Sequence, residues 1–140
     1  MSVILAVDPG REKCGLALVD ETTGMIWQRV VPATELMTTV AQTVRQDAVQ
    51  TVVAGDRTGS TRFKAQWDQS GLSAQARLVF VDEHMSSVEG RRRYLRDHPG
   101  RGLRRWLPIG LKTPDQPFDD YVAVILAERF LKKKTNLGME

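Results

Sequence analysis

The sequence predicts an α/β fold in which a five-stranded mixed sheet carries helices on both faces. Three apolar segments joined by short turns, residues 3–7, 14–19 and 25–31, predict an antiparallel meander. Beyond them strand and helix patterns alternate, which predicts parallel strands in the same sheet. The first segment is uninterrupted and ends at the turn Pro9-Gly10, which is typical of a strand buried on both faces. We therefore expect helices to cover both faces.

The alternating part begins with a helix. Residues 36–48 place apolar side chains at helical spacing, with Thr34 as the expected N-cap. Residues 51–55 and 77–81 read as short buried strands, and we expect residues 63–70 between them to be helical. This order of elements requires crossover connections, so the two later strands should run parallel to a neighbour.

The last third of the chain predicts two helices separated by a loop. Ser86 and Glu89 fit a capping box at the start of a basic helix, which residues 98–100 (His-Pro-Gly) end. Residues 101–117 hold several prolines and glycines and predict a loop. A final helix from residue 119 onward is apolar around most of its circumference, so we expect it to pack against the sheet.

The composition is that of a soluble globular protein, with 41% hydrophobic and 26% charged residues. A length of 140 residues suits one domain, and no segment resembles a membrane span or a signal peptide. Cys14 is the single cysteine, which excludes an internal disulfide and argues against a thiolate metal site. We expect a cytoplasmic protein consisting of one domain over residues 1–140.

Positive charge is concentrated in one segment, although the net charge of the chain is only +3. Residues 91–105 carry seven arginines against one acid, a net charge of +6, and residues 132–134 add three lysines. The arginines are Arg91, Arg92, Arg93, Arg96, Arg101, Arg104 and Arg105. Because Tyr94 and Trp106 lie among them, this segment predicts contact with a nucleic acid, although a charged run is more often a solvated face. The three lysines read as a solvated helix end.

Acidic side chains occur where strands end and where the last helix begins. Asp8 ends the first strand, Glu83 follows the last, and Asp119 and Asp120 open the final helix. The carboxyl ends of parallel strands share one edge, where sites form in open α/β sheets. Each residue also has a simpler interpretation: Asp8 as a turn residue, Glu83 as a solvated acid, and the aspartates as helix caps. Of the last two, Asp119 is the better cap and Asp120 the better ligand.

Together these carboxylates predict a metal site. Clustered carboxylates repel one another unless a cation lies among them, and all-oxygen ligands suit Mg²⁺ or Mn²⁺. Two such ions about 4 Å apart can hold a phosphate, activate water and stabilise the leaving oxygen. Next to a basic segment, this arrangement is typical of a phosphodiesterase that acts on nucleic acid.

Three motifs in order resemble those of one family. They are Asp8-x-Gly10 with Gly15-Leu16-Ala17, the segment Asp82-Glu83-His84-Met85-Ser86-Ser87-Val88-Glu89, and Asp120-Tyr121-Val122-Ala123, with Gly55 and Gly59-Ser60 as a shortened glycine loop. On these residues the chain resembles the YqgF/RuvX family of Holliday-junction resolvases and pre-16S rRNA processing nucleases, in the RNase H-like superfamily. The resemblance runs from residue 3 to about residue 131.

The resemblance implies an RNase H-like fold in which Asp8, Glu83 and Asp120 are the catalytic, metal-binding carboxylates, with Asp119 as second choice. Two positions depart from the family pattern at expected nucleic-acid contacts, since His84 and Lys13 stand where the family usually has arginine. His84 could contact a phosphate or relay a proton, although an exposed histidine after a strand often does neither.

The expected function is a metal-dependent endonuclease that cleaves structured nucleic acid. The first substrate we expect is the 5′ end of precursor 16S rRNA, and the alternative is a Holliday junction in branched DNA. A non-catalytic nucleic-acid-binding protein is a further alternative. A phosphate-binding ATPase of the actin-like type also opens with an Asp-x-Gly turn, and nucleotide-dependent thermal stabilisation would identify it. The sequence leaves open whether the chain is a monomer or a homodimer.

Overall fold

The computed structural model describes residues 2–57, 59–99 and 117–136 of the chain. Its sheet has the predicted five strands, in the order β3-β2-β1-β4-β5. They are β1 (Val3–Asp8), β2 (Lys13–Asp20), β3 (Gly24–Pro32), β4 (Thr51–Gly55) and β5 (Arg77–Val81). Strands β1, β2 and β3 pair antiparallel, whereas β4 runs parallel to β1 and β5 parallel to β4. The predicted meander followed by parallel strands is confirmed.

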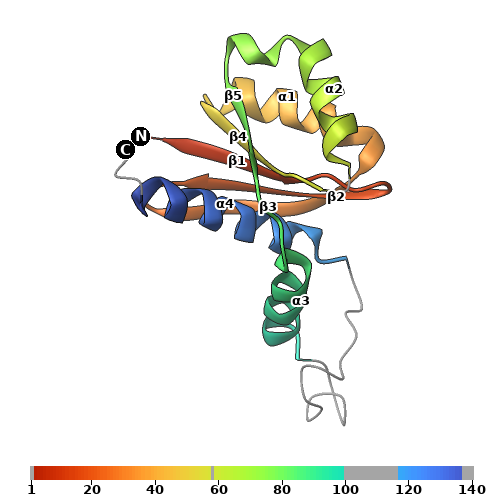
Figure 1. Ribbon diagram of the computed structural model, residues 1–140, viewed down its shortest axis with the longest axis vertical. Coiled ribbons are helices and arrows are strands. Elements are labelled where there is room, and N and C mark those ends of the chain that lie inside the picture. Colours follow the sequence, from red (N-terminus) through yellow and green to blue (C-terminus); the bar gives the residue numbers. More distant parts are fainter. Residues whose placement is uncertain (1, 58, 100–116, 137–140) are drawn as a thin grey trace.

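Helices cover both faces of this sheet, as Figure 1 shows. They are α1 (Leu36–Gln46), α2 (Ser60–Ser70), α3 (Ser86–Asp97) and α4 (Asp119–Asn136), with short 3-10 turns η1 (Ala33–Glu35) and η2 (Leu72–Ala74). Helices α1 and α2 lie on one face, and α4 crosses the other. Helix α3 leaves the end of the sheet and packs on the first part of α4.

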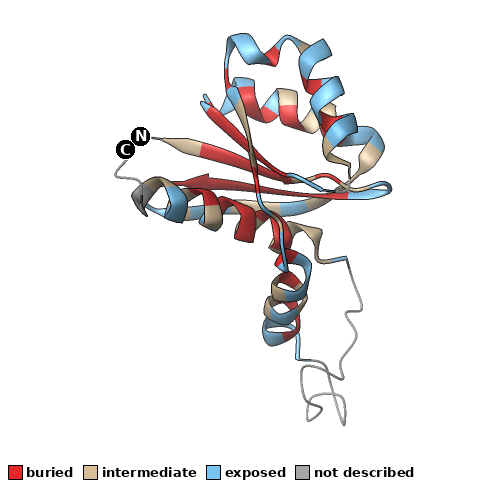
Figure 2. Cartoon of the chain, in the orientation of Figure 1, coloured by how far each residue is buried: buried red, intermediate tan, exposed pale blue. Residues whose placement is uncertain are grey.

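Most of the central strand β1 is buried, as its colour in Figure 2 shows. Its side chains alternate between two cores, one on each face of the sheet. Leu5 and Val7 pack with α1 and α2, whereas Ile4 and Ala6 pack with α4. All four side chains are fully buried. A strand that is apolar at consecutive positions therefore has a partner layer on each face, as the sequence predicts.

Two helices begin differently from the sequence-based prediction. Thr34 does not cap α1, because residues 33–35 form the 3-10 turn and Glu35 becomes the N-cap without a side-chain bond. Helix α2 starts at Ser60, three residues before the predicted segment. Gly59 precedes it in the left-handed conformation, with φ of 78°, which glycine adopts without strain.

The predicted capping box at Ser86 is wrong. Met85 is the N-cap of α3 and has φ of 62°, a left-handed conformation in which a long side chain is strained. The Ser86 hydroxyl donates to the Glu83 carbonyl oxygen at 2.7 Å, and Glu89 pairs with Arg93 one turn later. The Ser86 hydroxyl is therefore bonded within the tight turn after Glu83 and does not cap the helix.

Helix α4 holds the second core in place. Val122, Ala123 and Leu126 are buried against the sheet, and Gly90 of α3 lets Val122 approach, since a Cβ there would lie 2.8 Å from a Val122 methyl. In the parts of the chain that the structure describes, no helix is both long and apolar enough to cross a membrane.

Candidate active site

Asp8 lies at the carboxyl end of the central strand, where it meets two other acids. Its neighbours in the sheet are β2 and β4, so the side chain is held between two fixed strands. The pKa of Asp8 is raised to about 8, mainly by burial and in addition by the charges of Asp119 and Glu83 and by a hydrogen bond with Asp119. Without a cation, Asp8 therefore keeps a proton that it shares with Asp119.

Asp119 reaches Asp8 because α4 begins directly against β2. A Cβ on Gly15 would overlap the backbone of Asp119, so the absence of a side chain at Gly15 permits this contact. Burial raises the pKa of Asp119 as well, while its own backbone N–H and the hydrogen bond from Asp8 lower it. The two carboxyls thus form one hydrogen-bonded pair at the first turn of a helix, where the dipole favours negative charge.

Asp120, one residue further along, faces elsewhere. Its Oδ2 accepts a hydrogen bond from Nε2 of Gln28 on β3, at 2.9 Å. Successive residues of a helix point about 100° apart, so only one of the two aspartates can face Asp8. The carboxylate beside Asp8 is that of Asp119, the second choice of the sequence analysis, and Asp120 joins the helix to the sheet instead.

Glu83 follows the end of β5 and lies at the same edge of the sheet. Its Oε2 lies 2.5 Å from the position that a Cβ on Gly55 would take, so the glycine at the end of β4 makes room for the carboxylate. Burial raises the pKa of Glu83, a backbone N–H of Arg57 lowers it, and the charge of Asp56 raises it. Asp56 also accepts the Glu83 backbone N–H at 3.3 Å. These contacts hold Glu83 at the ends of β4 and β5.

A cavity of about 450 Å³ connects these acids, and we call it the carboxylate cavity. Its lining includes Asp8, Glu83 and Asp119, together with Arg57 and His84. Arg57 was not among the predicted site residues, although it lies just beyond the end of a parallel strand, at the edge where sites form.

Two exposed apolar side chains line the carboxylate cavity. Met85 is 55% exposed and Val88 is 49% exposed, and both line the cavity beside Ser87. Large exposed apolar side chains next to charged groups offer a surface for a ligand that is partly apolar.

The donor chemistry of this site fits a divalent cation. Asp8 and Asp119 present carboxylate oxygens that are in contact, and Glu83 is close enough to act electrostatically on Asp8. Oxygen-only ligand sets suit Mg²⁺ and Mn²⁺. However, within residues 2–57, 59–99 and 117–136, no three acidic, histidine or cysteine side chains lie close enough together to hold one ion. Of the three carboxylates that would bind the cation, Asp8 and Asp119 are therefore the two that already lie in contact.

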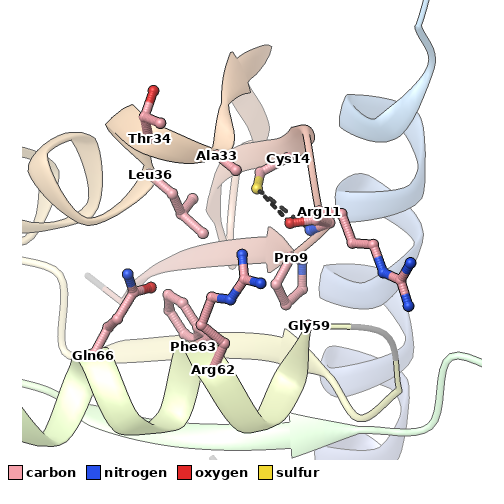
Figure 3. Close-up of a pocket in the computed structure, with 11 residues that line it drawn as sticks. Pro9, Arg11, Cys14, Ala33, Thr34, Leu36, Gly59, Arg62, Phe63 and Gln66 are labelled. Atoms are coloured by element: carbon pink, nitrogen blue, oxygen red, sulfur yellow. Dashed lines mark hydrogen bonds between the residues drawn. The ribbon is translucent and has the colours of Figure 1, made fainter.

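The turn that follows Asp8 is held by close backbone packing and by the single cysteine. A Cβ on Gly10 would overlap the Lys13 carbonyl, and Gly59 lies against Pro9. The Gly10 N–H donates to Cys14 Sγ at 3.3 Å, and burial raises the pKa of that thiol. Figure 3 shows the small cavity of about 200 Å³ behind this turn, where Arg62 points inward. These contacts fix the direction in which Asp8 leaves β1.

The predicted nucleic-acid contacts are spread over several places. Arg92 and Arg96 are exposed on α3 and Arg91 is half-buried there, whereas Arg93 is bound by Glu89 and Glu128, at 3.0 and 2.8 Å. Arg101, Arg104 and Arg105 lie outside the described residues.

Lys13 is exposed at the start of β2 and is absent from the lining of the carboxylate cavity. Ser60 is the first residue of α2, and its N–H donates to the Arg57 carbonyl. Of the predicted contacts on the described residues, only His84 lines this cavity.

Comparisons with known proteins identify the fold. No family model matches the chain, and no curated protein matches it either. The solved structures that resemble it include RuvC of Thermus thermophilus, with a TM-score of 0.59, 14% identity and coverage of 95% of this chain and 96% of that one. For the complex of T. thermophilus RuvC with a Holliday junction substrate, the TM-score is 0.55 and the identity 16%, with coverage of 99% of this chain and 97% of that one. For the Fowlpox virus resolvase bound to Holliday junction DNA, the TM-score is 0.59 and the identity 12%, with coverage of 94% of this chain and 97% of that one. At these identities the likeness concerns the fold, and the chain has the RNase H-like fold of RuvC.

Proposed function

We propose that this protein is a divalent-metal-dependent endonuclease that hydrolyses phosphodiester bonds of branched DNA. The observation that carries the proposal is the contact between Asp8 and Asp119, with the charge of Glu83 acting on Asp8. A buried acid whose pKa is raised by neighbouring acids is costly to keep in place, and such groups are typical of functional sites. Their position at the ends of the parallel strands of an RNase H-like sheet supports the same interpretation.

Each residue of the carboxylate cavity has a role in this proposal. Asp8 and Asp119 would hold Mg²⁺ or Mn²⁺, with Glu83 as the third carboxylate. When bound, two such ions would activate water and stabilise the leaving oxygen. Arg57 and His84 line the same cavity, where they can bind the phosphate that the carboxylates would repel. Because arginine can donate two parallel hydrogen bonds to a phosphate, Arg57 would also orient it.

Branched DNA is the substrate that the structural likeness favours, because two of the similar proteins are seen with Holliday junctions. The precursor 16S rRNA end is a second candidate, which the sequence motifs around Asp8, Glu83 and Asp120 support. Both substrates require the same phosphodiester chemistry, so one set of variants tests the site and a panel of substrates tests the choice. Nucleic-acid binding without cleavage is the remaining alternative.

The test compares three conservative variants, Asp8→Asn, Asp119→Asn and Asp120→Asn, on four-way DNA junctions, DNA duplexes and precursor rRNA ends. With Mg²⁺ or Mn²⁺ we expect the first two to lose at least about a hundredfold in cleavage rate, because a metal ligand contributes several kcal/mol. Asp120→Asn is the matched control and should lose less than about tenfold, because an Asn oxygen can still accept from Gln28.

Two results would contradict the proposal. If the unaltered protein cleaves none of these substrates, or if Asp8→Asn cleaves at the same rate, the nuclease function is wrong. If Asp120→Asn loses its activity and Asp119→Asn keeps it, the nuclease function stands and the third carboxylate is Asp120. If the protein cleaves precursor rRNA faster than four-way junctions, the substrate is precursor rRNA and not branched DNA.

A further inference from the structure

A second cavity adjoins the carboxylate cavity and lies between the end of β5 and helix α4. It has a volume of about 400 Å³ and is lined by Phe80, Val81, Asp82, His84, Arg129 and Lys133. His84 lines both cavities, so the two are neighbours at this residue. We call the second cavity the β5–α4 groove.

The charged groups of this groove favour an anion. Arg129 donates from Nη1 to the Asp82 carbonyl oxygen at 2.9 Å, which holds its guanidinium at the end of β5 and leaves other N–H donors available. Lys133 is exposed four residues further along α4, on the same face of the helix. Among the described residues of the lining, Asp82 is the only acid, and its carboxylate accepts the backbone N–H of His84 at 2.9 Å and lies 3.9 Å from Arg57.

We propose that the β5–α4 groove is the path along which one nucleic-acid strand leaves the carboxylate cavity, with Arg129 and Lys133 each binding a backbone phosphate. This inference rests on the proposed nuclease function. Three carboxylates repel the phosphates on either side of the scissile one, so a bound strand needs cations along its path. The groove is next to the carboxylate cavity at His84 and supplies two such cations, Arg129 and Lys133.

The helix sets the reach of this path. Asp119 and Lys133 lie fourteen residues apart on α4, which corresponds to roughly 21 Å at a rise of about 1.5 Å per residue. Lys133 would therefore meet a phosphate further from the scissile bond than the one that Arg129 meets, because Arg129 lies four residues closer to Asp119 on α4.

The experiment measures how affinity depends on salt for a four-way DNA junction, in EDTA so that no cleavage occurs. Lys133→Ala is compared with Lys132→Ala, which removes the same charge from an exposed residue outside the groove lining. We expect Lys133→Ala to reduce the slope of log affinity against log salt by about 0.9, as for one lost phosphate contact, and Lys132→Ala to leave it unchanged. Arg129→Gln should reduce the slope by a similar amount.

A series of shortened arms tests the position of the contact. On one side of the scissile bond, the difference between Lys133→Ala and the unaltered protein should disappear once the arm is too short to reach Lys133. Equal slopes for Lys133→Ala and Lys132→Ala, or a difference that persists on the shortest arms, would overturn the inference. If the protein cleaves and these slopes are equal, the groove is wrong and the nuclease function stands. If the slopes differ as expected and no substrate is cleaved, the groove stands and the nuclease function fails.

Discussion

The buried carboxyl of Asp8 predicts that the metal-free protein becomes less stable as the pH rises. Its pKa in the folded protein is about 8, against an ordinary value of 3.8. Between these two values the folded state holds a proton that the unfolded chain has lost. The contribution of the protonated Asp8 carboxyl to the free energy of unfolding is therefore fully present below about pH 4. It decreases as the pH rises, until the pH passes the folded-state pKa.

The size of the effect follows from the same pKa. Each pH unit within this window lowers the free energy of unfolding by about 1.4 kcal/mol. Between about pH 4.5 and pH 7.5 the protein therefore loses at most about 4 kcal/mol of stability. Asp8→Asn cannot ionise and escapes this loss. We expect the free energy of unfolding of the variant, relative to the unaltered protein, to increase by up to that amount over the same range.

The assay is urea unfolding in EDTA at a series of pH values, with Asp120→Asn as the control. Asp120 hydrogen-bonds Gln28 and lies outside the carboxylate pair, so its variant should follow the unaltered protein. Adding Mg²⁺ should reduce the pH dependence, because a cation bound by Asp8 and Asp119 takes the place of the shared proton. A difference between Asp8→Asn and the unaltered protein that does not change with pH would refute the reasoning.

Three further substitutions test how the backbone shapes the site. Gly15→Ala should destabilise the protein by about 3 kcal/mol, measured by urea unfolding, because the new Cβ meets the backbone of Asp119, which cannot move without α4. Gly55→Ala should cost less than about 1 kcal/mol, because the Cβ meets the movable end of Glu83. Its cleavage rate should nevertheless fall at least about tenfold, and an unchanged rate would contradict the role of Glu83. Met85→Gly should raise the stability by about 1 kcal/mol, because glycine relieves the left-handed conformation of a half-exposed residue; a lower thermal midpoint would contradict this.

The meander and the parallel strands that follow it could be predicted from the sequence because apolar periodicity acts locally. Residues 3–7 are apolar at every position, and the structure gives them a packed layer on each side. The strand-helix alternation after residue 36 leads to parallel strands, because a crossover through a helix leaves few other arrangements. Helix starts were less predictable, since Ser86 uses its hydroxyl for the turn after Glu83.

The candidate site was predictable in its location and less so in its members. Asp8 ends β1 and Glu83 follows β5, and the ends of parallel strands meet at one edge. Arg57 lies at the same edge but belongs to a polar loop, where one arginine has no periodic pattern to distinguish it. The β5–α4 groove joins residues 80–84 to residues 129–133, and no local pattern relates these two segments.

The sequence by itself determined the fold class, the edge of the sheet where acids gather and the presence of two adjacent aspartates at the start of α4. Only the tertiary structure decided which aspartate faces Asp8. The rotation of α4 about its axis depends on where the helix rests, and it rests on β2 at Gly15, which has no side chain to keep Asp119 away. Local propensity is the same for Asp119 and Asp120, so the choice between them is made by a contact between residues more than one hundred positions apart.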